Sequence, residues 1–215
     1  MTMLRERNKP AETATGRAVP DSIGSWTIDP AHSSVSFTWS RLRLVTTTGQ
    51  LHCFGVIHLD ALPPVGVIQF EQPSGLPVLT MALDPASLQT HDGDLDARLR
   101  SPEGFDVLRH RWWTLRSESL EILPTGAWRV MATLTATGNP GLVELRLEVD
   151  PKASSVDWLV LRGHGLLDRR GFGITKPVST FTTQIRLDLA VCARRVEPVP
   201  ASGGGGSTCT TSMPG

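Results

Sequence analysis

The chain of 215 residues has no tyrosine and only three cysteines, and its 21 basic and 21 acidic residues cancel. Three cysteines cannot form a paired disulfide framework, so free thiols in a reducing compartment are the simpler interpretation. A net charge of zero and a pI near 7.0 offer no bulk attraction to nucleic acid or to an anionic membrane. The composition therefore argues against nucleic acid as a partner.

Long apolar runs are missing as well. No segment approaches the roughly 20 apolar residues that a membrane-spanning helix needs, and residues 1–20 lack the apolar stretch of a secretory signal. We therefore expect a cytoplasmic protein without a transmembrane segment. Residues 1–23 and the Gly/Pro/Ser-rich residues 193–215 have no periodicity and are expected to be disordered tails around a domain at 24–192.

Motifs that carry catalysis or bind metals and nucleotides are also lacking. The sequence contains no G-x-S-x-G, Walker A or G-x-G-x-x-G motif, and its six histidines show no metal-ligand spacing. We expect no catalytic residue, no metal and no cofactor. The enzymatic alternative is a hydrolase that uses His91 with Asp92 or Asp94.

Alternation of apolar and polar residues is the main signal that is present. It is clearest at 142–149, where Val and Leu alternate with Glu and Arg, so that one face meets water and the other a core or cavity. At 46–60 the alternation changes phase, which predicts a β-bulge near Cys53–Gly55. Turns are expected at 124–126 and at 139–141. The remaining strands are expected at 34–39, 65–70, 77–83, 112–122, 128–137, 156–161 and 172–190. About eight hairpin-linked strands fit an antiparallel barrel, although periodicity alone does not exclude a β-sandwich.

One dense polar segment, residues 91–107, interrupts the strands. Two leucines four residues apart give it an apolar edge, and two acid-to-base pairs with the same spacing support a short helix. These are Leu95/Leu99, Asp94/Arg98 and Asp96/Arg100. Asp92 or Asp94 can cap the start, and Pro102 with Gly104 ends the helix. We interpret the segment as a lid across one end of a β-structure.

Three motifs in order resemble those of the YceI-like lipid/polyisoprenoid-binding family. They are Trp26-Thr27-Ile28-Asp29 with His32–Phe37, Asp94 through Leu99-Arg100-Ser101 to Phe105-Asp106-Val107, and Asp168–Ile174. The resemblance covers about Trp26 to Val191. It implies an all-β fold, an elongated antiparallel eight-stranded lipocalin-like barrel with one short helix capping an end.

The resemblance also implies a non-catalytic carrier that holds an amphiphilic isoprenoid, such as a quinone or polyprenyl chain, or a fatty lipid in the barrel lumen. Candidates for the lumen and its mouth are Phe37, Trp39, Arg41, Phe54, Leu99, Phe105, Trp113, Trp128, Phe172 and Phe181. A structural motif of buried partners that close one end is implied for Asp94, Arg98, Ser101, Asp106 and Arg169. Arg41, Arg98 and Arg169 are the candidates to meet a polar head group.

The chain departs from the family where a Tyr-Pro pair usually precedes a strand, because His110-Arg111-Trp112-Trp113 stands there. A lumen filled by Trp39, Trp113 and Trp128 would favour a second hypothesis, a ligand-free barrel that serves as a protein-interaction or stress-related module. An exposed sheet face could also support a homodimer.

Overall fold

The structure is a computed structural model that describes residues 23–41, 45–172 and 183–196. The described part consists of ten strands, one α-helix and one short 3-10 helix. The strands are β1 (Gly24–Ile28), β2 (Ser34–Arg41), β3 (Val45–Leu59), β4 (Ile68–Gln69), β5 (Leu79–Gln89), β6 (Trp113–Ile122), β7 (Trp128–Ala136), β8 (Asn139–Val149), β9 (Trp158–Asp168) and β10 (Gln184–Arg195). The helices are α1 (Gly93–Arg100) and η1 (Arg169–Phe172).

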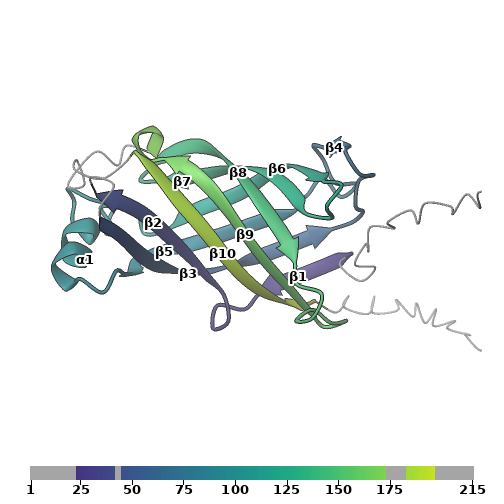
Figure 1. The fold of residues 1–215 in the computed structure, drawn as a ribbon, viewed down its shortest axis with the longest axis horizontal. Helices are drawn as coiled ribbons and strands as arrows, with labels where there is room; N and C mark the ends of the chain where they lie inside the picture. Colours follow the sequence, from purple (N-terminus) through teal and green to yellow (C-terminus); the bar gives the residue numbers. More distant parts are fainter. Residues whose placement is uncertain (1–22, 42–44, 173–182, 197–215) are drawn as a thin grey trace, which may run out of the picture.

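The strands form a closed antiparallel barrel with eight positions, as the sequence predicts (Figure 1). Neighbouring strands pair in the order β2, β3, β5, β6, β7, β8, β9 and β10, and β10 pairs back to β2. The two shorter strands each continue one of the eight positions. β1 continues the position of β2, because it pairs with β10 and β3, the neighbours of β2. β4 continues the position of β5, because it pairs with the part of β6 that β5 does not reach. Closure leaves one face of the sheet inside, which excludes the sandwich alternative.

The burial pattern follows the predicted alternation in most strands. In β8 the side chains of Val143, Leu145 and Leu147 are buried and the charged residues between them are exposed. In β3 one phase holds from Leu51 to Leu59, so the bulge expected near Cys53–Gly55 is absent. The irregularity lies instead at Gln50 and His52, which pair with Gln89 and Asp84 of β5. The additional residues of the bulge are therefore on β5.

Several element boundaries differ from the sequence prediction. The β7–β8 turn is Thr137-Gly138, with φ angles of 50° and 80°, whereas residues 139–141 already belong to β8. Two consecutive positive φ values give a turn whose twist matches that of paired strands. Of residues 65–70 only β4 is a strand. The strand β10 continues to Arg195 with Ala193 fully buried, so the barrel extends past the expected boundary at 192.

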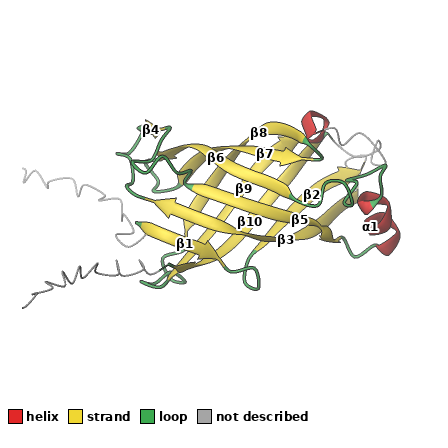
Figure 2. Cartoon of the chain, turned by 180° about the vertical axis from the view of Figure 1, so that it is seen from behind, coloured by secondary structure: helices red, strands yellow, loops and turns green. Residues whose placement is uncertain are grey.

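The two helices lie at one end of the barrel and β4 lies at the other (Figures 1 and 2). α1 begins as predicted: the Asp92 carboxylate accepts hydrogen bonds from the backbone N–H groups of Asp94 and Leu95. Because it lies across this end of the barrel, the helix forms the lid that the sequence predicts. In the described ranges, neither helix combines the length and apolar character that crossing a membrane requires.

Candidate ligand-binding interior of the barrel

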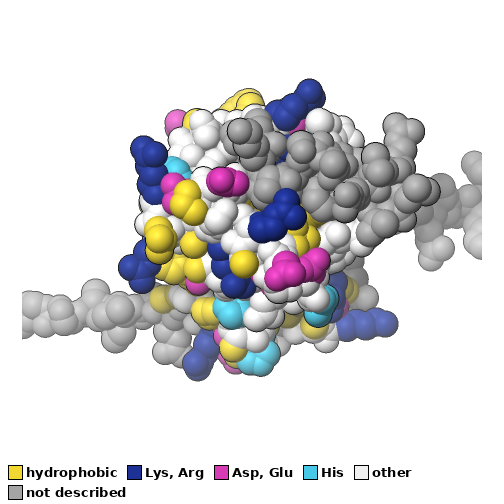
Figure 3. Space-filling view, turned by 90° about the vertical axis from the view of Figure 1, so that its left-hand side faces the viewer, with side chains coloured by type: hydrophobic (Ala, Val, Ile, Leu, Met, Phe, Trp, Pro, Cys, Tyr) yellow, Lys and Arg dark blue, Asp and Glu magenta, His cyan; other side chains and the backbone are white. Residues whose placement is uncertain are grey.

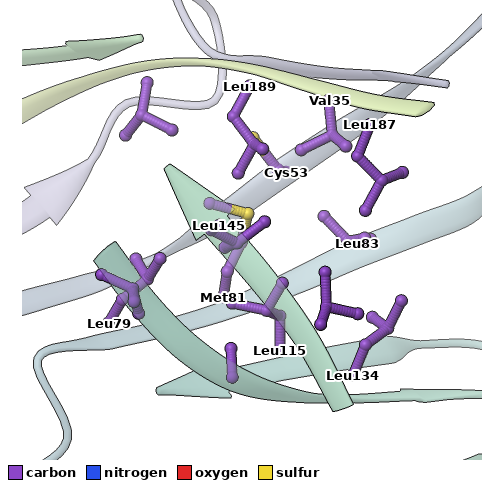
Figure 4. Close-up of a cluster of buried hydrophobic side chains, with 14 of the residues drawn as sticks. Val35, Cys53, Leu79, Met81, Leu83, Leu115, Leu134, Leu145, Leu187 and Leu189 are labelled. Atoms are coloured by element: carbon purple, nitrogen blue, oxygen red, sulfur yellow. The ribbon is translucent and has the colours of Figure 1, made fainter. Parts of the chain in front are cut away.

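The interior of the barrel is apolar along its length. Among the buried residues of the described strands only two are polar, Ser117 and Ser119, where the β6–β7 register shifts. The Ser117 hydroxyl accepts a hydrogen bond of 3.0 Å from the backbone N–H of Leu79. Side chains from opposite walls point toward one another across the barrel, as Figure 4 shows for Val35, Leu187 and Leu189 above Met81, Leu115 and Leu134.

Aromatic rings gather inside the α1 end. The rings of Phe37 and Trp39, on β2, stack with centroids 4.5 Å apart. Phe105, which follows the lid, meets Trp113 of β6 edge to face at 4.7 Å. Gly49 on β3 makes room for the stack, because a Cβ atom there would lie 2.4 Å from Cζ of Phe37. The α1 end is therefore lined by rings.

Asp96 fixes the lid to the barrel. Its carboxylate is buried and accepts hydrogen bonds from the backbone N–H of Thr90 at 2.9 Å and from the Thr90 hydroxyl at 2.6 Å. The guanidinium of Arg100 donates to the carbonyl of Leu88 and lies 3.9 Å from the Asp96 carboxylate. Leu99, which is 1% exposed, points into the core beneath the helix. The lid is thus held by polar bonds at its edge and by apolar burial beneath it.

A second closure at the same end comes from η1. The side chain of Phe172 is buried against Gly141, where a Cβ atom would lie 2.7 Å from the ring. The Thr137 hydroxyl donates a hydrogen bond to the backbone carbonyl of Phe172. The β7–β8 turn and η1 are thereby tied together.

Most of the predicted lumen residues are buried within the barrel or at its capped end. These are Phe37, Trp39, Leu99, Phe105, Trp113, Trp128 and Phe172. Phe54 is a correction: its side chain is 38% exposed and packs edge to face on Trp112 on the outer surface. In the single phase of β3, the buried residues are Leu51, Cys53, Ile57 and Leu59, and Phe54 lies on the opposite, outward phase. The side chain of Arg41 and all of Phe181 lie outside the described residues.

The predicted structural motif is buried in part. Arg169 is 6% exposed, Ser101 and Asp106 are half-buried, and Asp94 and Arg98 face solvent. For Asp94 and Arg98 the expectation of burial was wrong, and the buried acid of the helix is Asp96. The signal for Asp96 was its position three residues before Leu99, which places both on one helix face.

The electrostatics of the site are consistent with an apolar interior. Burial raises the pKa of the Cys53 thiol to about 11. Seen from the α1 end, the surface mixes charges of both signs with scattered apolar side chains (Figure 3).

Within the described ranges, no group of three or more His, Cys, Asp and Glu side chains could hold a metal ion. His91 is exposed, and the Asp92 carboxylate beside it caps α1.

Solved structures share this fold at low sequence identity. A polyisoprenoid-binding domain from Saccharophagus degradans is 16% identical, with a TM-score of 0.61 over 80% of this chain and 98% of that one. BcnA of Burkholderia cenocepacia is 17% identical, with a TM-score of 0.59 over 77% and 98%. The Campylobacter jejuni YCEI protein is 20% identical, with a TM-score of 0.50 over 61% and 80%. No curated protein matches the chain.

Residues 26–193 match the YceI-like domain family. This range contains β2 to β9, most of β10, both helices and the three sequence motifs, and it covers well over half of the chain. The chain belongs to the YceI-like domain family.

Proposed function

We propose that the protein binds a long-chain amphiphilic lipid of the isoprenoid class, a quinone or a polyprenyl chain, inside the barrel without chemical conversion. The observation that carries the proposal is the continuous apolar interior, in which Ser117 and Ser119 are the only polar buried residues of the described strands. Burial of a lipid chain is favourable by about 0.8 kcal/mol per methylene group, so an apolar interior can retain such a chain without any catalytic group.

Relatives support the same proposal. The structure from Saccharophagus degradans that shares this fold is described as a polyisoprenoid-binding domain. The present chain has the same barrel at 16% identity. The class of lipid that it binds is therefore proposed from its own interior side chains.

Entry of a lipid requires the interior side chains to move apart. Leu145, Cys53 and Val130, in the middle of the barrel, are each 0% exposed, so their neighbours already enclose them. A lipid chain must therefore replace contacts between side chains, which lowers the net gain from its burial.

This packing also favours a second candidate, a ligand-free barrel that acts as a protein-interaction module. Trp39, Trp113 and Trp128 are all buried inside the barrel, where they occupy space that a lipid would need. The two candidates differ in whether the folded barrel ever takes up a lipid.

Native mass spectrometry of the protein purified from its host, followed by organic extraction, tests the proposal. A stoichiometric lipid released on unfolding supports it and identifies the lipid class. An empty barrel that also fails to take up quinones, polyprenols and fatty acids in vitro contradicts it and favours the interaction module.

A matched pair of variants tests whether packing limits uptake. Leu145→Ala removes a buried interior side chain, whereas Leu166→Ala removes one that is 60% exposed on the outside. We expect Leu145→Ala to take up more lipid than the wild type, and Leu166→Ala to take up the same amount. Equal uptake by all three proteins would show that interior volume does not control binding.

A further inference from the structure

The indole nitrogen of Trp113 is a buried donor without an acceptor. The Trp113 side chain is 6% exposed, and none of the described residues accepts a hydrogen bond from its Nε1–H. A buried tryptophan N–H usually has a partner, because leaving a donor unpaired away from water costs free energy. A phenylalanine would fill similar apolar space without that cost. The unpaired N–H therefore marks the indole as a group that a ligand could satisfy.

The position of Trp113 indicates where an acceptor could come from. Trp113 begins β6 at the α1 end and faces Phe105, which follows the lid. β10 lies four strand positions away around the eight-position barrel and therefore forms the opposite wall. Among apolar core residues, exposure is highest for Ile185 on that wall, at 8%, and for Leu167 paired beside it, at 7%. The two highest exposed fractions in the apolar core are therefore found at the end where the unpaired donor lies.

The surrounding side chains offer the indole no competing polar partner inside the barrel. Trp113 pairs with Leu83 on β5, and its interior neighbour along β6, two residues on, is Leu115. The hydroxyl of Ser117, the nearest buried polar group along the same strand, is used by the backbone of β5. The described residues therefore supply no acceptor to the Trp113 indole, whereas a ligand in the interior would supply one.

We infer that Trp113 is the polar anchor of the lipid site: its Nε1–H donates a hydrogen bond to an oxygen at the head of the bound lipid. This inference rests on the proposed function and specifies the ligand class. The lipid carries an uncharged oxygen acceptor, such as an alcohol or a quinone carbonyl, at one end. Its head lies beneath α1 and its chain runs along the apolar interior toward β4.

Competition between phytol and phytane tests the inference, because the two share one branched carbon skeleton and only phytol has an oxygen. The delipidated full chain is incubated with each lipid, and bound lipid is measured by native mass spectrometry. A neutral hydrogen bond changes an equilibrium constant by roughly 2- to 10-fold, so the wild type should prefer phytol by that factor. Trp113→Phe should lose the preference. The control Trp112→Phe changes the adjacent tryptophan, whose side chain is 45% exposed on the outer surface, and should keep it.

The possible outcomes separate the inference from the function. If the wild type binds both lipids equally, or if Trp113→Phe keeps the preference, the anchor is refuted and the lipid-binding function stands. If the wild type binds neither lipid, the proposed function fails and the anchor fails with it.

A measurement on the wild type decides the case in which Trp113→Phe does not fold. The chain has six tryptophans, so ¹⁵N labelling of the indoles gives six Nε1–H resonances. One of them should move downfield when phytol is added and not when phytane is added. Six indole resonances that respond identically to the two lipids would refute the anchor.

Discussion

Asp96→Ala should destabilise the protein far more than Asp94→Ala, although both residues are acids at the start of α1 with an arginine four residues later. The Asp96 carboxylate accepts two hydrogen bonds from Thr90, whereas Asp94 faces solvent and no hydrogen bond of its carboxylate links the helix to the barrel in the described structure. The comparison isolates the polar contact that fixes the lid.

The magnitude follows from the groups left behind. Hydrogen bonds to a charged acceptor contribute about 1.5–3 kcal/mol, and truncation leaves the N–H of Thr90 buried without an acceptor. The Thr90 hydroxyl keeps only its bond of 3.4 Å to the carbonyl of Asp92. The ion pair with Arg100 adds little, because the atoms are 3.9 Å apart and the Arg100 side chain is 38% exposed. We expect Asp96→Ala to lose about 2–4 kcal/mol of unfolding free energy. Asp94→Ala should lose less than about 1 kcal/mol, the contribution of an exposed acid to the helix dipole.

Urea denaturation followed by circular dichroism measures both losses, with the dependence on urea concentration compared to confirm that the change is in stability. Asp96→Asn keeps one oxygen that can accept from Thr90 and should recover part of the loss. Equal losses of unfolding free energy for Asp96→Ala and Asp94→Ala would refute the reasoning and would show that apolar contacts alone hold the lid.

Two further predictions concern the interior. Gly49→Ala should cost about 1–3 kcal/mol, because the new methyl group would overlap the ring of Phe37, whose stacking on Trp39 prevents it from moving aside; thermal unfolding measures the loss. Cys53 should react with iodoacetamide at pH 8 at least about 100-fold more slowly than an ordinary thiol, because burial raises its pKa from 9.0 to about 11. The raised pKa also adds stability that is complete below about pH 9 and is lost as the pH rises toward 11.

Each of these predictions has a control. Gly171→Ala places a methyl group with no atom within 4 Å, so it should leave the unfolding temperature nearly unchanged. A loss as large as that of Gly49→Ala would contradict the steric argument. For the thiol, the reaction is repeated in concentrated urea and followed by peptide mass spectrometry. Cys53 that reacts as fast in the native protein as in urea would contradict its burial.

The β-structure was predictable because its signal is local. A strand exposes alternate side chains to opposite faces, so the alternation at 142–149 already separates the buried residues of β8 from its exposed ones. Capping is equally local: an acid just before a helical segment accepts from the first free N–H groups, as Asp92 does for α1. The existence of the strands, the lid and its N-cap therefore followed from the sequence.

Errors arose where the direction of a side chain depended on the tertiary structure. Phe54 was assigned to the lumen on a strand expected to bulge near Cys53–Gly55, but β3 keeps one phase there and turns this ring outward onto Trp112. Asp94 matches the family motif, yet the helix rotates by about 100° per residue and it is Asp96 that lies on the buried face with Leu99. In both cases the direction of a side chain depended on pairing or packing that single positions do not encode.

The sequence by itself determined that this chain forms amphipathic strands, a capped short helix and a family-specific set of motifs, since each depends on neighbours along the chain. Only the tertiary structure decided the closure of β10 onto β2, with Leu187 facing Phe37 across about 150 residues of sequence. Only closure makes one face of every strand an enclosed interior. It also leaves the indole N–H of Trp113 buried without an acceptor among the described residues. Whether a donor is paired depends on all the groups around it in space, which the sequence does not reveal.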